Sequence, residues 1–149
     1  MKKSATPWQD KLHKNQPPVI KEGPEKWNIR FGGPRMLIAS PELVYEKIKT
    51  IPKGEVMTMK ELRARLAEDF DADYTCPLTA GIFLRIAAEA AEEMTTAGNR
   101  PELPWWRIIP DDYRLNNRLP GNGVLQAGRL RDEGFRVETK DMVTFRVLL

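Results

Sequence analysis

Apolar positions at helical spacing predict two helices in the first half of the chain. The first begins after Ser40, which can cap it, with Pro41 in a position that suits the first helical turn, and it ends at the motif IPKG. The second covers TMKELRARLAEDF, where Thr58 and Glu61 form a capping box. The short segment EVMT before it is predicted to be extended.

A third helix, rich in alanine, is predicted from Pro77 to the Gly98-Asn99 pair. Only the polar turn 71–75 separates it from the second helix. Two helices joined by so short a turn are typical of a helix-turn-helix pair, and we predict one here.

Beyond Pro104 the apolar positions alternate, which predicts a strand through WWRII. Successive side chains of a strand point to opposite faces, so Trp105 and Trp106 are not expected to enter the same core. One ring then has a place in the core, and the other needs a different explanation.

The last predicted elements are a helix and a hairpin. The helix covers VLQAGRLRDEG, with Val124, Leu125 and Leu130 as its buried face and Gly134 after its last turn. The segments FRVE and MVTFRVLL flank TKD and predict a terminal hairpin. The predicted fold class is α+β: a winged helix-turn-helix-like domain with a small sheet or wing.

Residues 1–40 are predicted to form a basic, Pro- and Gly-rich N-terminal arm before a domain over residues 41–149. The stretch NQPPVIKEGPEKW is not expected to sustain a helix, because each proline removes a donor and restricts the residue before it. Trp8, Trp27 and Phe31 are too apolar for a wholly disordered arm, so we expect it to dock partly on the domain.

The net charge of +3 conceals an uneven distribution. Residues 1–40 hold eight basic and three acidic side chains, a net +5, which leaves −2 for the remainder. A basic arm can contact phosphate groups, or it can be a solvated tail, and both interpretations stay open. The near-neutral domain has no basic run of the kind that nucleic-acid binders often carry.

The composition fits one globular domain of 149 residues, with 41% hydrophobic and 30% charged positions. No apolar run approaches the roughly 20 residues of a membrane span, and residues 1–10 lack the apolar core of a secretory signal. Cys76 is the only cysteine, which excludes an internal disulfide and favours a cytoplasmic location. We expect a monomer without a membrane partner.

Few residues fit the common kinds of enzymatic chemistry. His13 is the only histidine, which argues against a Ser-His-Asp or Cys-His arrangement, and no zinc-ligand cluster is present. The motif GNG lacks the full dinucleotide fingerprint, so neither a metal nor a cofactor is expected. Cys76 precedes a predicted helix start, where the helix dipole can activate a thiol; a reactive role is the lesser alternative to a buried cysteine.

Four stretches in order, IPKGEVMTMKELRARL, LTAGIFLRIAAEA, LPWWRII and QAGRLRDEGFRV, resemble the DNA-binding domain of the O6-alkylguanine-DNA alkyltransferases, in particular their alkyltransferase-like relatives. The resemblance covers residues 41–137 and depends on order and spacing rather than on one decisive motif. The repair enzymes carry a nucleophilic cysteine in a P-C-H-R-V sequence. The matching residues here run from Pro104 to Ile108, with Trp105 at the cysteine position and Trp106 at the histidine position.

This substitution implies a protein that is not an enzyme. An indole has no nucleophile comparable to a thiolate, so suicide alkyl transfer is not expected. Alkyltransferase-like proteins bind O6-alkylguanine in DNA without repairing it and mark the lesion for other repair machinery. By this resemblance, the expected partners are double-stranded DNA, alkylated where a lesion is recognised, and a DNA-repair protein.

The resemblance also implies a pocket for a base rotated out of the duplex. Such bases are held against aromatic or apolar side chains, and we expect Trp105 to line the pocket under a lid formed by residues 117–121. Arg107 and Glu133 are expected to hold the pocket floor to a helix end. The expected pocket residues are Trp105, Trp106, Arg107, Asn117, Leu119 and Gly121. In the alternative, the two indoles only fill the space between helix and sheet.

The expected DNA contacts lie at the start of the second helix and on the third, with lysines of the arm in addition. They are Thr58, Met59, Leu78, Thr79, Gly81 and Arg85. Met59 and Leu78 stand where the family has a tyrosine that helps rotate the nucleotide and an arginine that fills the gap. Leu78 could still act as an apolar wedge; otherwise both are core residues and base rotation has been lost.

The alternative function is a winged-helix protein-interaction module that has lost DNA binding. Glu89, Glu92 and Glu93 on the third helix count against DNA binding by the face that carries them, because acids that faced a duplex would repel its phosphates. They must point away from any bound DNA. Binding to a random duplex at low salt distinguishes the two functions.

Overall fold

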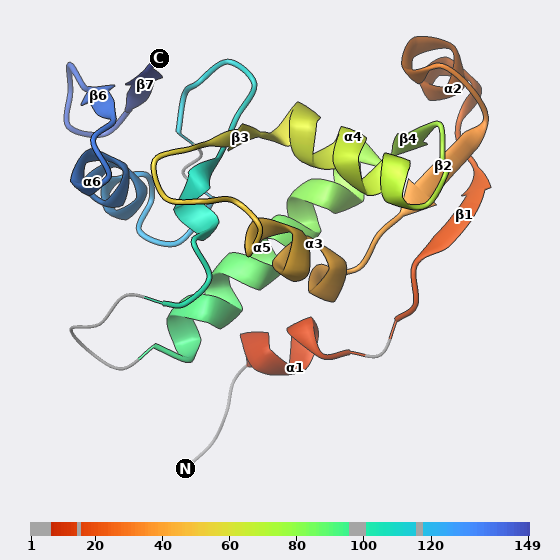
Figure 1. Ribbon diagram of the computed structural model, residues 1–149, viewed down its shortest axis with the longest axis horizontal. Coiled ribbons are helices and arrows are strands. Elements are labelled where there is room, and N and C mark those ends of the chain that lie inside the picture. Colours follow the sequence, from red (N-terminus) through yellow and green to blue (C-terminus); the bar gives the residue numbers. More distant parts are fainter. Residues whose placement is uncertain (1–6, 15, 96–100, 116–117) are drawn as a thin grey trace.

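The computed structural model describes residues 7–14, 16–95, 101–115 and 118–149, and these form a mixture of helices and small sheets (Figure 1). The α+β fold class is thereby confirmed. The elements in chain order are α1 (Trp8–Leu12), β1 (Val19–Glu22), α2 (Glu25–Phe31), β2 (Arg35–Ile38), α3 (Pro41–Ile48), β3 (Met57–Thr58), α4 (Met59–Asp69), β4 (Tyr74–Thr75), α5 (Pro77–Glu93), the 3-10 helix η1 (Trp105–Arg107), β5 (Ile108–Ile109), α6 (Val124–Asp132), β6 (Arg136–Glu138) and β7 (Arg146–Leu148).

The long helix α5 organises the helical part of the molecule and contacts α1, α3 and α4. Val44 and Ile48 of α3, Leu62 and Leu66 of α4, and Leu84 of α5 meet in the main core. Burial stabilises each such side chain by about 1.5–3 kcal/mol relative to leaving it in water. The helix-turn-helix pair α4–α5 is therefore held by apolar packing on the face that points into the molecule.

The starts of α3 and α4 confirm the caps predicted from the sequence. The Ser40 hydroxyl accepts a hydrogen bond from the Leu43 amide at 3.1 Å, and a proline follows at the first helical position. At α4, the Glu61 amide donates to the Thr58 hydroxyl at 3.2 Å, and the Thr58 amide donates to the Glu61 carboxylate at 3.2 Å. These local bonds satisfy donors that have no partner within the helix.

The described residues before Ser40 share a sheet with residues after it. Strand β2 pairs antiparallel with β1 and parallel with β4, with Leu37 opposite Thr75. Leu37 lies in the main core, and Leu12 of α1 is also buried. The segment predicted as an arm thus packs against the rest of the molecule through a sheet and a helix.

Two predictions of local structure in this region were wrong. The proline-rich stretch was expected to exclude a helix, but α2 begins at Glu25, directly after Pro24. A proline before the first turn removes no helical bond, because the first amides of a helix have no partner within it. The predicted polar turn 71–75 contains strand β4. Directly after this strand, the Cys76 amide donates a hydrogen bond to the Leu37 carbonyl of β2 at 2.8 Å.

The predicted strand through WWRII was also largely wrong. Trp105 and Trp106 lie in the 3-10 helix η1, and only Ile108 and Ile109 form a strand, β5, parallel to β3. The Arg107 amide donates back to the Pro104 carbonyl at 3.0 Å, which closes the turn. A tight turn does not send neighbouring side chains to opposite faces as a strand does, and both indoles are buried.

The C-terminal helix and hairpin are present, with one correction. Strands β6 and β7 pair antiparallel, as predicted. Helix α6 has the expected position, but Val124 is exposed, and its buried face consists of Gln126, Ala127, Arg129 and Leu130. Helix α5 ends at Glu93, and the predicted stop at 98–99 lies outside the described residues.

The described residues contain neither a membrane-spanning helix nor a metal-ligand cluster. None of their helices has the length and apolar character that a membrane crossing requires. Within the same residues, no group of three or more His, Cys, Asp or Glu side chains could hold a metal ion.

Candidate nucleic-acid interface

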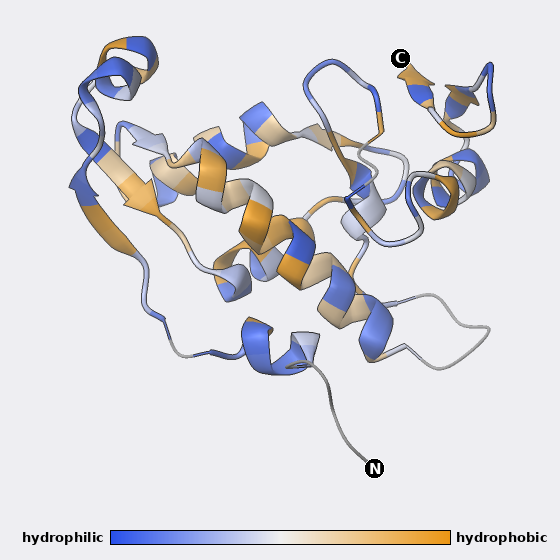
Figure 2. Ribbon diagram, turned by 180° about the vertical axis from the view of Figure 1, so that it is seen from behind, coloured by the Kyte–Doolittle hydropathy of each residue, from blue (hydrophilic) through white to orange (hydrophobic). Residues whose placement is uncertain are grey.

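The outer face of α5 exposes large aliphatic side chains near the start of the helix. Leu78 is 65% exposed, and Ile82, one turn later, is 51% exposed. Gly81 lies on the same exposed face, and a Cβ added there would meet no atom within 4 Å. In the view from behind, hydrophobic positions are visible along this helix (Figure 2). Adjacent exposed apolar side chains are more informative about binding than single ones, because water disfavours contiguous apolar surface.

A groove of about 470 Å³ lies beside this face, between α5 and α1. It brings together Leu78, Gly81 and Arg85 from the predicted DNA contacts and Leu119 from the predicted pocket. The lining includes three cations, Lys11, Arg85 and Arg118, and one aromatic ring, that of Trp8. None of the described residues that line it is acidic. The groove therefore combines an apolar floor with positive charge.

Helix α1 is fastened to the second half of α5. The Glu93 carboxylate accepts hydrogen bonds from the Trp8 amide at 3.0 Å and the Gln9 amide at 2.9 Å. The Gln9 side chain donates to the Ala90 carbonyl at 2.6 Å, and Leu12 is buried. A five-residue helix is unstable alone, so these contacts determine where α1 lies.

Two cationic side chains lie over the Trp8 ring. The Lys11 ammonium lies 4.2 Å from the ring centroid, and the Arg85 guanidinium carbon lies 5.3 Å from it. Arg85 also faces Glu89 at 3.7 Å, with half of its side chain exposed. An exposed pair of this kind contributes little to stability, which leaves Arg85 able to take another anionic partner.

The acidic residues of α5 are occupied by partners within the protein. Glu89 faces Arg85, Glu93 caps α1, and Glu92 binds Arg129 and Trp105. Their predicted orientation away from a duplex is consistent with these contacts, since none of the three lines the groove.

Trp105 lies deep in the core. Its side chain has no exposed surface, and its Nε1 donates to the Glu92 carboxylate at 2.7 Å. Its ring meets that of Trp106 edge to face, with centroids 6.1 Å apart, and the Arg129 guanidinium carbon lies 5.6 Å from the Trp105 centroid. It does not line the groove between α1 and α5. Stacking of a base on Trp105 requires this packing to open, and that role stays a prediction.

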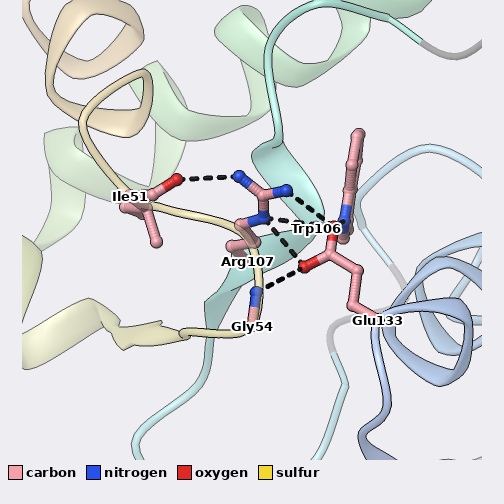
Figure 3. Close-up of polar contacts among 5 residues, drawn as sticks. All are labelled: Ile51, Gly54, Trp106, Arg107 and Glu133. Carbon is pink, nitrogen blue, oxygen red and sulfur yellow. Dashed lines mark hydrogen bonds and ion pairs between the residues drawn. The ribbon is translucent and has the colours of Figure 1, made fainter.

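Arg107 and Glu133 bind each other, whereas their expected role at a pocket floor stays a prediction (Figure 3). The Arg107 Nε and Nη2 donate to the Glu133 carboxylate at 2.9 and 2.8 Å, and its Nη1 donates to the Ile51 carbonyl at 2.7 Å. The same carboxylate accepts from the Trp106 Nε1 at 2.8 Å and from the Gly54 amide at 3.3 Å. This cluster joins the 3-10 turn, the loop after α3 and the end of α6.

Glu133 stays ionised because its hydrogen bonds outweigh its burial. Its side chain is only 2% exposed, and this burial by itself raises the pKa of the carboxyl. Hydrogen bonds from Arg107, Trp106 and the Gly54 amide act in the other direction, and the pKa ends below its usual value. The carboxylate is therefore a fixed structural charge rather than a candidate proton donor.

Several other predicted site residues lie apart from the groove or are engaged elsewhere. The Thr58 side chain serves the cap of α4, and Met59 packs partly buried on the core, as the core alternative predicts. The Thr79 hydroxyl oxygen is buried without a hydrogen-bond partner in the described residues. Gly121 adopts a left-handed φ of 78°, and Asn117 lies outside the described residues.

Trp8 and Ile82 line the groove and were missed in the sequence, and Lys11 was expected to contact DNA only as one of the lysines of the arm. Ile82 could have been found, because it lies one helical turn from Leu78 on the same face. Trp8 and Lys11 could not be assigned, since the bonds that place α1 reach across more than eighty positions of the sequence.

No family model and no curated protein matches the chain. Two solved structures are similar to it. The crystal structure of S. pombe Atl1 in complex with damaged DNA containing O6-carboxymethylguanine shares 21% identity, covers 71% of this chain and 85% of its own, and has a TM-score of 0.46. The crystal structure of S. pombe ATL in complex with DNA shares 19% identity, covers 73% and 88% of the two chains, and has a TM-score of 0.49. Both are of an alkyltransferase-like protein, the class that the sequence resembles.

Proposed function

We propose that this protein binds double-stranded DNA without carrying out a reaction on it, and that the outer face of α5 meets the duplex. The observation that supports this most is the exposed pair Leu78 and Ile82 beside the cations of the groove. Phosphate contacts supply much of the affinity of DNA-binding proteins, and apolar side chains can enter between base steps. The face offers both.

Each residue of this face has a separate role in the proposal. Leu78 is the wedge that inserts between base steps, because it is the most exposed aliphatic side chain of α5. Gly81 lets the helix approach the duplex closely, and Arg85 pairs with a phosphate in place of Glu89.

Absence of alkyl transfer is part of the proposal. Trp105 stands where the resembled repair enzymes have their nucleophile, and its only polar atom is hydrogen-bonded to Glu92. The thiol of Cys76 belongs to a residue that is 4% exposed and packs with Met36 and Tyr74, which argues against attack on a DNA lesion. Recognition of O6-alkylguanine and recruitment of a DNA-repair protein are the finer parts of the proposal, and they rest on the sequence resemblance.

Fluorescence anisotropy with labelled duplexes tests the proposal. We expect the wild type to bind a plain duplex at low salt and an otherwise identical duplex with one O6-methylguanine more tightly. Leu78→Ala is expected to weaken binding to both by fivefold or more, since truncating a side chain inserted in an interface costs more than about 1 kcal/mol. Val124→Ala is the matched control, because Val124 is similarly exposed but lies on α6.

The outcomes separate the parts of the proposal. Equal binding to the two duplexes would remove lesion recognition and leave DNA binding in place. No binding to either duplex at low salt would remove the proposed function. The protein-interaction alternative would then gain, supported by Met142 and Val143, which the turn between β6 and β7 exposes to solvent.

A further inference from the structure

The groove between α1 and α5 has the size and chemistry of a ligand site. Its volume of about 470 Å³ falls within the roughly 300–1,000 Å³ that is usual for small-molecule sites. Aliphatic side chains of α5 form one wall, and the Trp8 ring lies in another. The Lys11 ammonium and the Arg85 guanidinium carbon lie over that ring, 4.2 and 5.3 Å from its centroid.

The apolar walls, the aromatic ring and the positive charges of the groove fit a whole nucleotide better than a base or a phosphate alone. An apolar ligand would make no use of the positive charges of Lys11 and Arg85, and a bare phosphate would leave the aromatic and aliphatic walls uncovered. A nucleotide carries a flat aromatic base and an anionic phosphate on one unit. Stacking of bases on aromatic rings or on arginine planes recurs in proteins that bind unpaired nucleotides.

We infer that the groove between α1 and α5 binds one unpaired nucleotide of the DNA, with its base against Trp8 and its phosphate at Lys11 and Arg85. The inference rests on the proposed function and gives the same α5 face a preference for DNA in which a base has left the stack. The site is distinct from Trp105, which is fully buried, whereas Trp8 borders an open groove.

The position of Trp8 is set in advance by α5. Glu93 holds the amides of Trp8 and Gln9, and buried Leu12 anchors the other end of α1. The wall is therefore in place before a nucleotide arrives, and binding pays little for ordering it. Leu78 lines the same groove, so a wedge that unstacks a base step lies beside the site that would receive the base.

Two labelled duplexes of the same sequence test the inference, one fully paired and one with a single unpaired nucleotide. We expect the wild type to bind the second more tightly. Trp8→Leu keeps apolar bulk but removes the ring, and we expect it to lose the preference by roughly 5- to 150-fold, the factor that corresponds to stacking of one base. Trp8→Phe should retain most of the preference.

Trp27→Leu is the matched control, because Trp27 lies in the same N-terminal region but packs beside Met36 and Tyr74 and does not line the groove. Thermal melts report whether each variant folds. If Trp8→Leu melts early, Lys11→Gln is the second variant, and it should weaken binding to the duplex with the unpaired nucleotide more than binding to the paired one.

Each result decides between the inference and the proposed function. If the wild type binds paired DNA but shows no preference for the unpaired nucleotide, or if Trp8→Leu keeps that preference, the inference is wrong and the proposed function stands. If the wild type binds neither duplex, the proposed function fails, and the inference fails with it.

Discussion

Glu133 shows what one buried carboxylate does at the scale of the residue. It accepts hydrogen bonds from Arg107, Trp106 and Gly54, which belong to two separate segments, and it lies just beyond the end of α6. Removing one partner of a buried ion pair leaves the other charge without compensation. The loss of Glu133 would therefore cost more free energy of folding than the loss of its hydrogen bonds alone, and it would release the 3-10 turn from the end of α6.

We predict that Glu133→Ala destabilises the fold by about 3–5 kcal/mol, because the Arg107 guanidinium is left buried and unpaired. Urea unfolding measures this. Glu46→Ala is the control: Glu46 pairs with Lys49 at 3.7 Å on the surface, where both side chains are more than half exposed, and its loss should change little. Equal effects of the two substitutions would contradict the structural role of Glu133.

The same carboxylate has a defined pH dependence. Its folded-state pKa is lowered, so its contribution is complete above the unfolded pKa of glutamate, about 4.3, and is lost as the pH falls through the lower folded value. We expect the difference in unfolding free energy between the wild type and Glu133→Gln to shrink as the pH is lowered from 7 to 3. A difference that grows on acidification would contradict the ionised carboxylate.

At the scale of the element, α1 depends on α5. It has five residues and no side-chain cap of its own, and Glu93 takes the place of that cap. Loss of a helix N-cap costs about 1 kcal/mol, which corresponds to roughly fivefold in an equilibrium.

We predict that Glu93→Ala increases amide hydrogen exchange in residues 8–12 about fivefold, with little change in the core helices. Hydrogen exchange with mass spectrometry measures this by peptide. Glu89→Ala is the control, because Glu89 lies on the same helix and faces Arg85 instead of α1. Unchanged exchange in Glu93→Ala would mean that the burial of Leu12 and the bond from Gln9 to the Ala90 carbonyl fix α1 without Glu93.

Local signals made some elements predictable and others not. The caps at Ser40 and Thr58 could be found because donor and acceptor lie within three residues of each other. The alternation around Trp105 predicted a strand, because the periodicity does not reveal that the chain turns back at Pro104. The two-residue strand β4 forms only because β2 lies beside it.

The same distinction applies to the candidate site. Leu78, Gly81 and Arg85 were predicted and line one groove, because they share one helix and helical spacing determines the face. The predicted place of Trp105 was a pocket, whereas its indole lies in the main core, bonded to Glu92 and close to Arg129 from two other helices. Contacts between distant segments are not encoded in the spacing of any single segment.

At the scale of the whole molecule, the position of the positive charge matters more than its sum. The net charge of the chain is only +3, yet three cations line one groove, and none of its described lining residues is acidic. Each phosphate neutralised by a cation contributes about −0.9 to the slope of log affinity against log salt. Overall charge and local charge therefore predict different results for variants with the same net charge.

We expect the double variant Lys11→Gln/Arg85→Gln to reduce the magnitude of that slope by about 1.8, the contribution of two phosphate contacts. The matched control is Lys26→Gln/Arg30→Gln, which removes the same charge from exposed positions of α2, outside the groove. Anisotropy titrations of the duplex with one unpaired nucleotide at several salt concentrations give both slopes. If the control changes the slope as much as the groove variant does, the affinity for DNA depends on the net charge of the chain. The phosphates would then not be bound specifically at the groove. A change confined to the groove variant would place the phosphate contacts beside Trp8, because Lys11 and Arg85 both lie against that ring.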